Sequence, residues 1–267
     1  MSVLDDILAT KRDEVTLLHR PDVREQLVHV ALEAPPTRNF TGALRLDSGT
    51  LGVVAEIKRR SPSKGALAPE LDPASHAAAY KAGGASALSV LTDGPFFGGT
   101  VEDLRGARDA TGLPTLRKDF VIDEVQVYET RAIGADAVLL IVAAVRDQAL
   151  LRDLHDLASA LGLAALVEVH SRDELDRALD TGARIVGVNA RDLGTFDEDL
   201  SAGERIIADI PSDVVAVAES AIRTVADAAR MAAAGFDAIL VGEALVRAVD
   251  PTALVRDLAA IDRHGRH

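Results

Sequence analysis

Eight short apolar runs, each followed by a segment of helical periodicity, predict an α/β protein with the (β/α)8 fold, the TIM barrel. The runs are too short for helices and rich in β-branched residues, which is typical of strands buried on both faces. Because they recur roughly every 20 to 35 residues, a closed parallel barrel fits them better than an open sheet. The predicted strands are 52–58, 87–91, 115–118, 137–141, 164–168, 185–188, 214–218 and 238–241.

Glycines and helical segments separate these runs. A glycine closes the helical segment before six of the strands, where a left-handed backbone ends a helix at little cost. The clearest predicted helices cover residues 123–133, 146–161 and 222–234. No Gly-x-Gly-x-x-Gly follows the first strand, which weakens a dinucleotide-binding sheet as the alternative.

Residues 1–48 precede the first strand and predict a helical extension packed on one mouth of the barrel, which occupies residues 49–267. Ser2 is the expected helix cap, and apolar residues at 4, 7, 8, 15 and 18 follow a 3.6-residue rhythm. Pro35 and Pro36 stop helix formation. A solvated tail is the alternative, but an apolar stripe needs a surface to cover. We therefore expect one domain overall.

Composition and charge exclude several classes of function. The 267 residues carry 29 Lys and Arg against 42 Asp and Glu, a formal charge of −13, with no cysteine. Disulfide-stapled folds and cysteine-ligated zinc are excluded, and a nucleic-acid partner is disfavoured. The apolar runs are too short for a bilayer crossing, and Asp5 and Asp6 interrupt any signal-peptide pattern, so we expect a cytoplasmic protein. The seven histidines, His170 included, show no metal-ligand spacing.

Ionisable and amide side chains gather where the predicted strands end. Barrel active sites lie at the carboxyl ends of the strands, and we expect the strand starts to carry no comparable set. Buried charges cost several kcal/mol unless they are paired, so a purely structural ion-pair network is the alternative. The candidate catalytic residues are Glu56, Lys58, Lys118, Glu168, Asn189 and Glu219.

The loops after the last two strands predict a phosphate site. Backbone N–H groups at helix starts bind anions, and barrels commonly hold phosphate at these two strands. The residues concerned are Ser220, Ala221, Gly242 and Glu243, with Lys58 and Arg191 as cationic partners. Residues 61–65, after the first strand, predict a mobile loop or a simple linker.

The same residues resemble those of the indole-3-glycerol phosphate synthase family over essentially the whole chain. The matching stretches are Ala55–Gly65, Ser89–Asp93, Phe96–Gly98, Leu116–Phe120, Leu166–His170, Gly187–Leu193 and Ala218–Ser220. The resemblance implies a cofactor-free and metal-free lyase of tryptophan biosynthesis. Its phosphorylated small-molecule substrate is 1-(2-carboxyphenylamino)-1-deoxyribulose 5-phosphate, which closes to an indole with loss of CO2 and then water.

The resemblance also implies roles. Lys118 is the general acid, Glu168 acts in dehydration, Glu56 and Asn189 hold hydroxyls, and Glu219 orients the lysines. Lys58 contacts anionic groups, while Ser220, Gly242 and Arg191 lie at the phosphate; Ser61, Phe120, Ala221 and Glu243 complete the expected binding set. We expect Lys58 to depress the pKa of Lys118, and apolar walls to raise that of Glu168.

Ala221 departs from the family pattern, which usually has glycine there. Three other functions stay open from the sequence: an Amadori isomerase, a class I aldolase with Lys118 as the Schiff base, and a non-catalytic barrel. The Ala-rich outer helices leave a monomer or a weak homodimer as the expected state.

Overall fold

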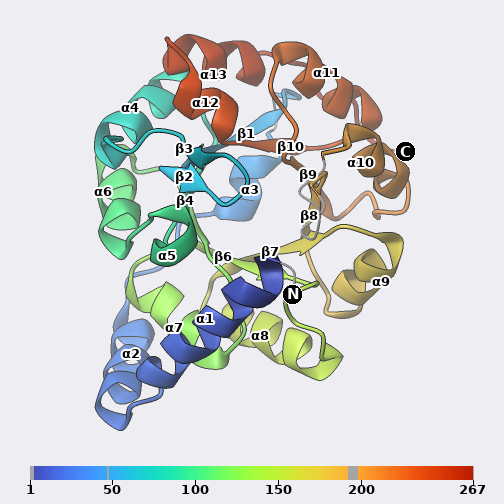
Figure 1. Cartoon of the computed structure of the whole chain (residues 1–267). Coiled ribbons are helices and arrows are strands. Elements are labelled where there is room, and N and C mark those ends of the chain that lie inside the picture. The colour runs from blue at the N-terminus through green and yellow to red at the C-terminus, as the bar shows by residue number, and fades with distance from the viewer. Residues whose placement is uncertain (1–2, 47, 192–197, 267) are drawn as a thin grey trace.

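Eight parallel strands close into a barrel in the computed structural model, which describes residues 3–46, 48–191 and 198–266 (Figure 1). Around the barrel the order is β1-β10-β9-β8-β7-β6-β5-β4, and a small antiparallel pair, β2 and β3, lies in the loop after β1. The predicted (β/α)8 fold is confirmed. The strands are β1 (Gly52–Ile57), β2 (Arg60–Ser61), β3 (Gly65–Ala66), β4 (Ala87–Leu91), β5 (Thr115–Lys118), β6 (Ala137–Ile141), β7 (Ala164–Val169), β8 (Ile185–Asn189), β9 (Val215–Glu219) and β10 (Ala238–Val241).

Helices surround the barrel, and their ends follow from their caps. α8 begins at Gln148, because the side chain of Asp147 accepts a hydrogen bond from the N–H of Ala149. The turn after Ile222 is excluded from α11, because Thr224 and Asp227 form a capping box. The surrounding helices are α4 (Pro73–Gly83), α5 (Gly94–Phe97), α6 (Val101–Thr111), α7 (Glu124–Ala132), α8 (Gln148–Ala160), α9 (Arg172–Asp180), α10 (Leu200–Ile207), α11 (Val225–Ala234), α12 (Glu243–Arg247) and α13 (Pro251–Ala259). In the described part of the chain, none is long and apolar enough to cross a membrane.

The period of two along each strand directs side chains alternately to the barrel interior and to the helices. In β5, Leu116 is fully buried in the interior, and Lys118 stands two residues further on the same face. In β7 the corresponding pair is Leu166 and Glu168. The apolar interior therefore ends at the carboxyl rim in charged side chains.

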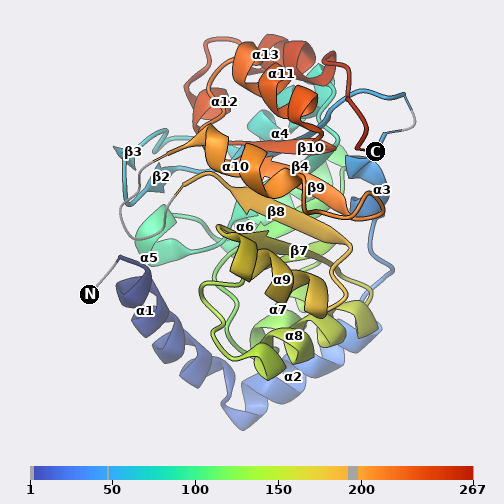
Figure 2. The ribbon, with the colours of Figure 1, turned by 90° about the vertical axis from the view of Figure 1, so that its right-hand side faces the viewer.

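The N-terminal helices touch both ends of the barrel. α1 (Val3–Leu18) lies on the same side as β2, β3 and α5, whereas α3 (Phe40–Leu44) lies at the opposite end (Figure 2). Between them α2 (Pro21–Glu33) packs along α7. At the far end α3 comes so close to β1 that a Cβ on Gly52 would lie 2.5 Å from the Leu44 carbonyl oxygen. Ser2, the expected cap of α1, lies outside the described residues.

The strand starts carry buried charges, so the expectation that this end would lack them is wrong. Asp136 precedes β6, is fully buried, and pairs with Arg108 at 2.9 Å. Asp237 precedes β10 and pairs with three arginines, Arg45, Arg263 and Arg266, at 2.7–3.0 Å. Asp136 also accepts the backbone N–H of Thr115, and Asp237 that of Ala216, so the buried charges at this end are both ion-paired and hydrogen-bonded.

Candidate active site

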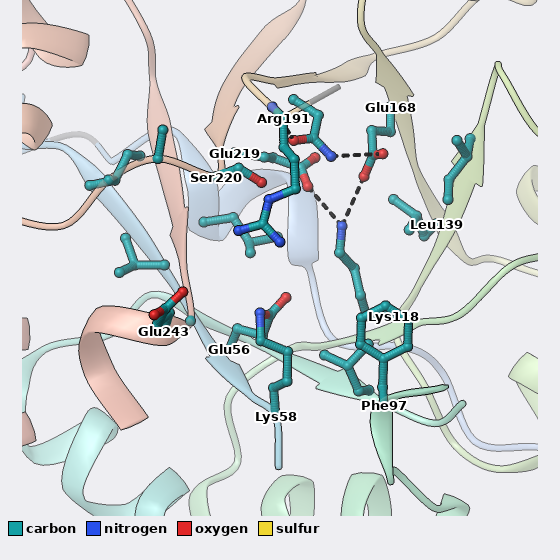
Figure 3. A pocket seen from close by; sticks show the side chains of 18 of the residues that line it. Glu56, Lys58, Phe97, Lys118, Leu139, Glu168, Arg191, Glu219, Ser220 and Glu243 are labelled. Atoms are coloured by element: carbon teal, nitrogen blue, oxygen red, sulfur yellow. Dashed lines mark hydrogen bonds and ion pairs between the residues drawn. The ribbon is translucent and has the colours of Figure 1, made fainter. Parts of the chain in front are cut away.

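An open pocket occupies the carboxyl rim of the barrel, and the predicted site residues gather in it (Figure 3). Apolar side chains form its floor, among them Leu139, Ile141 and Leu240. Twelve of the thirteen predicted residues line the pocket: Glu56, Lys58, Lys118, Phe120, Glu168, Asn189, Arg191, Glu219, Ser220, Ala221, Gly242 and Glu243.

Ser61 is the predicted residue that does not line the pocket. It belongs to β2, is buried, and has its Oγ 3.5 Å from that of Ser63. Ser63 does not line the pocket either, but its Oγ accepts a hydrogen bond of 3.1 Å from Arg191, which does. The buried position of Ser61 in the short β2–β3 pair keeps it out of the pocket lining.

Lys118 stands between two carboxylates. Its Nζ lies 2.9 Å from Glu168 Oε2 and 2.8 Å from Glu219 Oε2 (Figure 3). Burial alone would lower the pKa of Lys118, but the two carboxylates raise it above its ordinary value. The expected depression by Lys58 is wrong, because Lys58 pairs instead with Glu56, at 2.6 Å. Lys118 is therefore a protonated lysine in its resting state.

The two glutamates differ in their protonation. Burial favours the neutral form of Glu168, but Lys118, His170 and a hydrogen bond of 3.0 Å from Asn189 lower its pKa to about 2. The expected rise is wrong, because these donors outweigh the apolar walls. Burial raises the pKa of Glu219 to about 7, since Lys118 offsets only part of that effect and the Glu168 carboxylate adds to it. Glu219 is thus the carboxyl group that holds a proton near neutral pH.

Two glycines leave room for these carboxylates. A Cβ on Gly242 would lie 2.2 Å from Glu56 Oε1, and a Cβ on Gly187 would lie 1.9 Å from Glu219 Oε1. Both distances are far below any real contact with a Cβ atom. Gly242 was expected to contact phosphate, and the structure adds that it makes space for Glu56.

Replacing Gly187 by alanine is expected to push Glu219 away from Lys118. Overpacking of this kind costs about 1–3 kcal/mol, and we expect kcat to fall by roughly tenfold or more as the ion pair is distorted. Gly106→Ala on α6 is the matched control, because a Cβ there meets nothing within 4 Å. Steady-state kinetics and thermal unfolding of both variants measure the effect. A Gly187→Ala variant with the kinetics of the control contradicts this account of Glu219.

The predicted phosphate loop has an unusual backbone. Ser220 and Ala221 have φ angles of 65° and 59°, and among the described residues they alone are non-glycine residues in the left-handed region. Such strain clusters at functional sites, where the surrounding structure holds it in place. Ala221 therefore keeps the conformation that a glycine would adopt there, despite its methyl group.

Ala221→Gly is expected to stabilise the protein. It removes a steric cost of roughly 1–2 kcal/mol and adds a chain-entropy cost of roughly 0.5–1 kcal/mol, so the free energy of unfolding should rise by up to about 1.5 kcal/mol. Ala229→Gly, at an exposed position of α11, is the control and should lower it by about 1 kcal/mol. Urea denaturation decides between them. An equal loss of unfolding free energy in the two variants would mean that the backbone at residue 221 is unstrained.

Arg191 is held at the rim by residues that the sequence reasoning missed. Its guanidinium pairs with Glu198, which also pairs with Arg223, and all three side chains line the pocket. Phe97 was another omission; its ring lies 6.1 Å from that of Phe120, centroid to centroid. The signal for Phe97 was its place in the Phe96–Gly98 motif. Glu198 lies beyond the Gly187–Leu193 motif that contains Arg191. The last two residues of that motif, Asp192 and Leu193, are outside the described residues.

Fold and site together define a barrel enzyme with acid–base groups around an open pocket. The family model of indole-3-glycerol phosphate synthase matches residues 4–258. The chain belongs to this family. It is a carboxy-lyase of tryptophan biosynthesis that acts on a phosphorylated small molecule, and the expected resemblance is confirmed.

Relatives of the same name match nearly full length. The chain is 47% identical to the indole-3-glycerol phosphate synthase of Mycobacterium ulcerans, over 98% of this chain and 96% of that protein. It is 46% identical to indole-3-glycerol phosphate synthase 1 of Streptomyces coelicolor, over 99% of this chain and 97% of the relative. A solved structure of thiamine phosphate pyrophosphorylase from Pyrococcus furiosus shares the fold alone, with a TM-score of 0.60 and 20% identity over 84% of this chain and 97% of that one.

Proposed function

We propose that Lys118 is the general acid of ring closure. The observation that carries this is its position between Glu168 and Glu219 above an apolar floor. As the ring carbon attacks the ketone, negative charge develops on the ketone oxygen, and a protonated lysine within hydrogen-bond reach transfers its proton there. Departure of CO2 then returns the bonding electrons to the ring. Lys118 regains a proton from Glu219, which is protonated near neutral pH.

Glu168 acts as the base of the dehydration step in this proposal. Loss of water needs a proton on the leaving hydroxyl, which the reprotonated Lys118 donates, and removal of a hydrogen from the neighbouring carbon. The low pKa of Glu168 keeps it a carboxylate that can accept that hydrogen as a proton. Its Oε2 shares Lys118 with Glu219, so the acid of one step and the base of the next face the same small volume.

The remaining residues bind the substrate along the pocket. Ser220, Ala221 and Gly242 hold the phosphate, with Glu243 in the first turn of α12. Lys58 and Arg191 contact anionic groups, and Glu56 and Asn189 hold hydroxyls. Phe97, Phe120 and the apolar floor receive the anilino ring. Anchors at both ends of the substrate would bring its ring and its ketone together, and this proximity contributes a large share of the rate enhancement.

We also propose that the N-terminal extension, 1–48, and the barrel, 49–267, form one domain. Lys11 of α1 pairs with Asp93 and Asp119 of the barrel rim, which supports this.

The protein is proposed to work as a monomer or weak homodimer in the cytoplasm, without nucleic acid. Light scattering at several concentrations tests the oligomeric state.

Indole fluorescence after addition of the anilino-ribulose phosphate tests the activity directly, because the chain has no tryptophan and its background is low. The rival class I aldolase forms a Schiff base on Lys118, which borohydride would trap. We expect indole to form and no adduct to be trapped. A borohydride adduct on Lys118 would contradict its role as a general acid and support covalent catalysis by this lysine.

Inorganic phosphate is expected to compete with the substrate. At millimolar concentration it should raise KM and leave kcat unchanged, because it occupies the cradle at Ser220, Ala221 and Gly242. Sodium chloride at matched ionic strength is the control and should have a smaller effect. Inhibition of kcat alone, or no inhibition by phosphate, contradicts this placement of the anion.

A further inference from the structure

His170 connects the Glu168 carboxylate to helix α9. It follows β7 directly, and its ring is mostly buried, with 15% of the side chain exposed. Its Nδ1 lies 3.2 Å from Glu174 Oε2, and the same oxygen accepts the His170 backbone N–H at 2.7 Å. Its Nε2 faces Glu168 Oε1 at 3.5 Å and is buried without a hydrogen-bond partner among the described residues. The ring is not among the described side chains that line the pocket.

Both ring nitrogens of His170 therefore face carboxylate oxygens. An ionised carboxylate only accepts hydrogen bonds, so a neutral imidazole would turn one lone pair toward one of them. The doubly protonated ring instead directs an N–H group toward each carboxylate. Burial would lower the pKa of His170, but Glu174, Glu168 and the more distant Glu219 raise it.

The charge of His170 also distinguishes the two carboxyl groups that flank Lys118. Glu168 has His170 and Asn189 on Oε1 and Lys118 on Oε2. Glu219 has Lys118 on Oε2, and its Oε1 is buried without a hydrogen-bond partner in the part of the chain that the structure describes. A positive ring behind Glu168 favours its ionised form and leaves the shared proton on Glu219.

We propose that His170 is a positioning residue: an imidazolium, anchored by Glu174, that holds Glu168 as a carboxylate turned toward Lys118. This rests on the proposed role of Glu168 as the base. The charged groups that act on His170 are Glu168 on β7, Glu174 on α9 and Glu219 on β9, with Lys118 on β5 acting through Glu168. His170 does not touch the substrate, and its effect reaches the reaction through one carboxylate.

Two substitutions remove the charge of the His170 ring, and each keeps an amide near the position of one ring nitrogen. His170→Asn keeps an amide near the position of Nδ1, facing Glu174, and removes the contact with Glu168. His170→Gln places an amide near the position of Nε2 without the charge. Both should move the acidic limb of the kcat/KM profile upward by roughly one pH unit, because Glu168 loses a positive neighbour and is protonated at higher pH. On the plateau above the limb, kcat and KM should stay within about threefold of wild type.

His155→Asn is the matched control. His155 is also largely buried and lies on α8, and we expect its replacement to lower the melting temperature without moving the pH profile. A uniform loss of kcat at every pH in the His170 variants, with no shift of the limb, assigns His170 a structural role only and overturns the proposal.

Imidazole 15N NMR tests the proposal without activity. The His170 ring, assigned by comparison with His170→Asn, should be doubly protonated at pH 7, and it should lose its proton at lower pH in Glu174→Gln and in Glu168→Gln. A neutral His170 ring at pH 7 in the wild type overturns the proposal. If Glu168→Gln retains wild-type turnover, the proposed role of Glu168 fails instead, and the NMR result still reports on His170.

Discussion

Lys118→Met is expected to lose about 10²–10⁴-fold in kcat, because the general acid is removed and no other described cation contacts both Glu168 and Glu219. Methionine keeps most of the length of the side chain, so the shape of the pocket changes little. The phosphate cradle lies on other strands, and the variant should still bind indole-3-glycerol phosphate. Steady-state indole fluorescence gives kcat, and a binding titration gives the affinity for the product.

Two further lysine variants separate this role from a general effect of charge. Lys58→Met should raise KM more than it lowers kcat, because Lys58 pairs with Glu56 and is proposed to contact the substrate's anionic groups. Lys81→Met, on α4, should leave both constants unchanged, since its Nζ contacts the carbonyl oxygen of Thr111 away from the pocket. Near-wild-type turnover in Lys118→Met contradicts the assigned acid.

Lys11→Met is expected to destabilise the fold by about 3–5 kcal/mol, the usual cost of removing one partner from a buried ion pair. The Lys11 side chain is 2% exposed, and its Nζ lies 2.8 Å from Asp93 and 3.0 Å from Asp119, both buried. Burial alone would disfavour its charge, but these carboxylates raise the pKa of Lys11 above its ordinary value. Without the lysine, the partners of Asp93 within residues 3–46, 48–191 and 198–266 are backbone N–H groups of α5.

Urea unfolding measures this loss, and Lys11→Arg is the control, since it keeps the charge at the cost of some packing. Asp119 follows Lys118 directly, so the extension fixes the rim next to the proposed acid. A loss below about 1 kcal/mol in Lys11→Met would mean that α1 contributes no more than an exposed ion pair does.

Much of the barrel could be predicted from local sequence signals. Short β-branched runs marked the strands, and the position of Lys118 and Glu168 at the ends of their strands placed both at one rim. The capping residues Asp147 and Thr224 explain why α8 and α11 begin later than the predicted segments. These features depend on residues close together in the chain.

Features that depend on distant partners escaped prediction. The pairing of Asp237 with Arg45 joins residues 192 positions apart, and no local pattern indicates it. The pKa shift of Lys118 had the wrong expected direction because Lys58 pairs with Glu56, and that of Glu168 because Lys118, His170 and Asn189 outweigh its apolar walls. His170 was set aside because it shows no metal-ligand spacing, and the role now proposed for it depends on its contacts with Glu168 and Glu174 in the folded chain.

The most direct test of the central claim is the crystal structure of the protein with an unreactive analogue, the alcohol obtained by reducing the ketone of the substrate. The account predicts the new hydroxyl within about 3 Å of Lys118 Nζ, with the phosphate at Ser220, Ala221 and Gly242. An analogue whose hydroxyl lies against Lys58, or whose phosphate lies away from that loop, would contradict it.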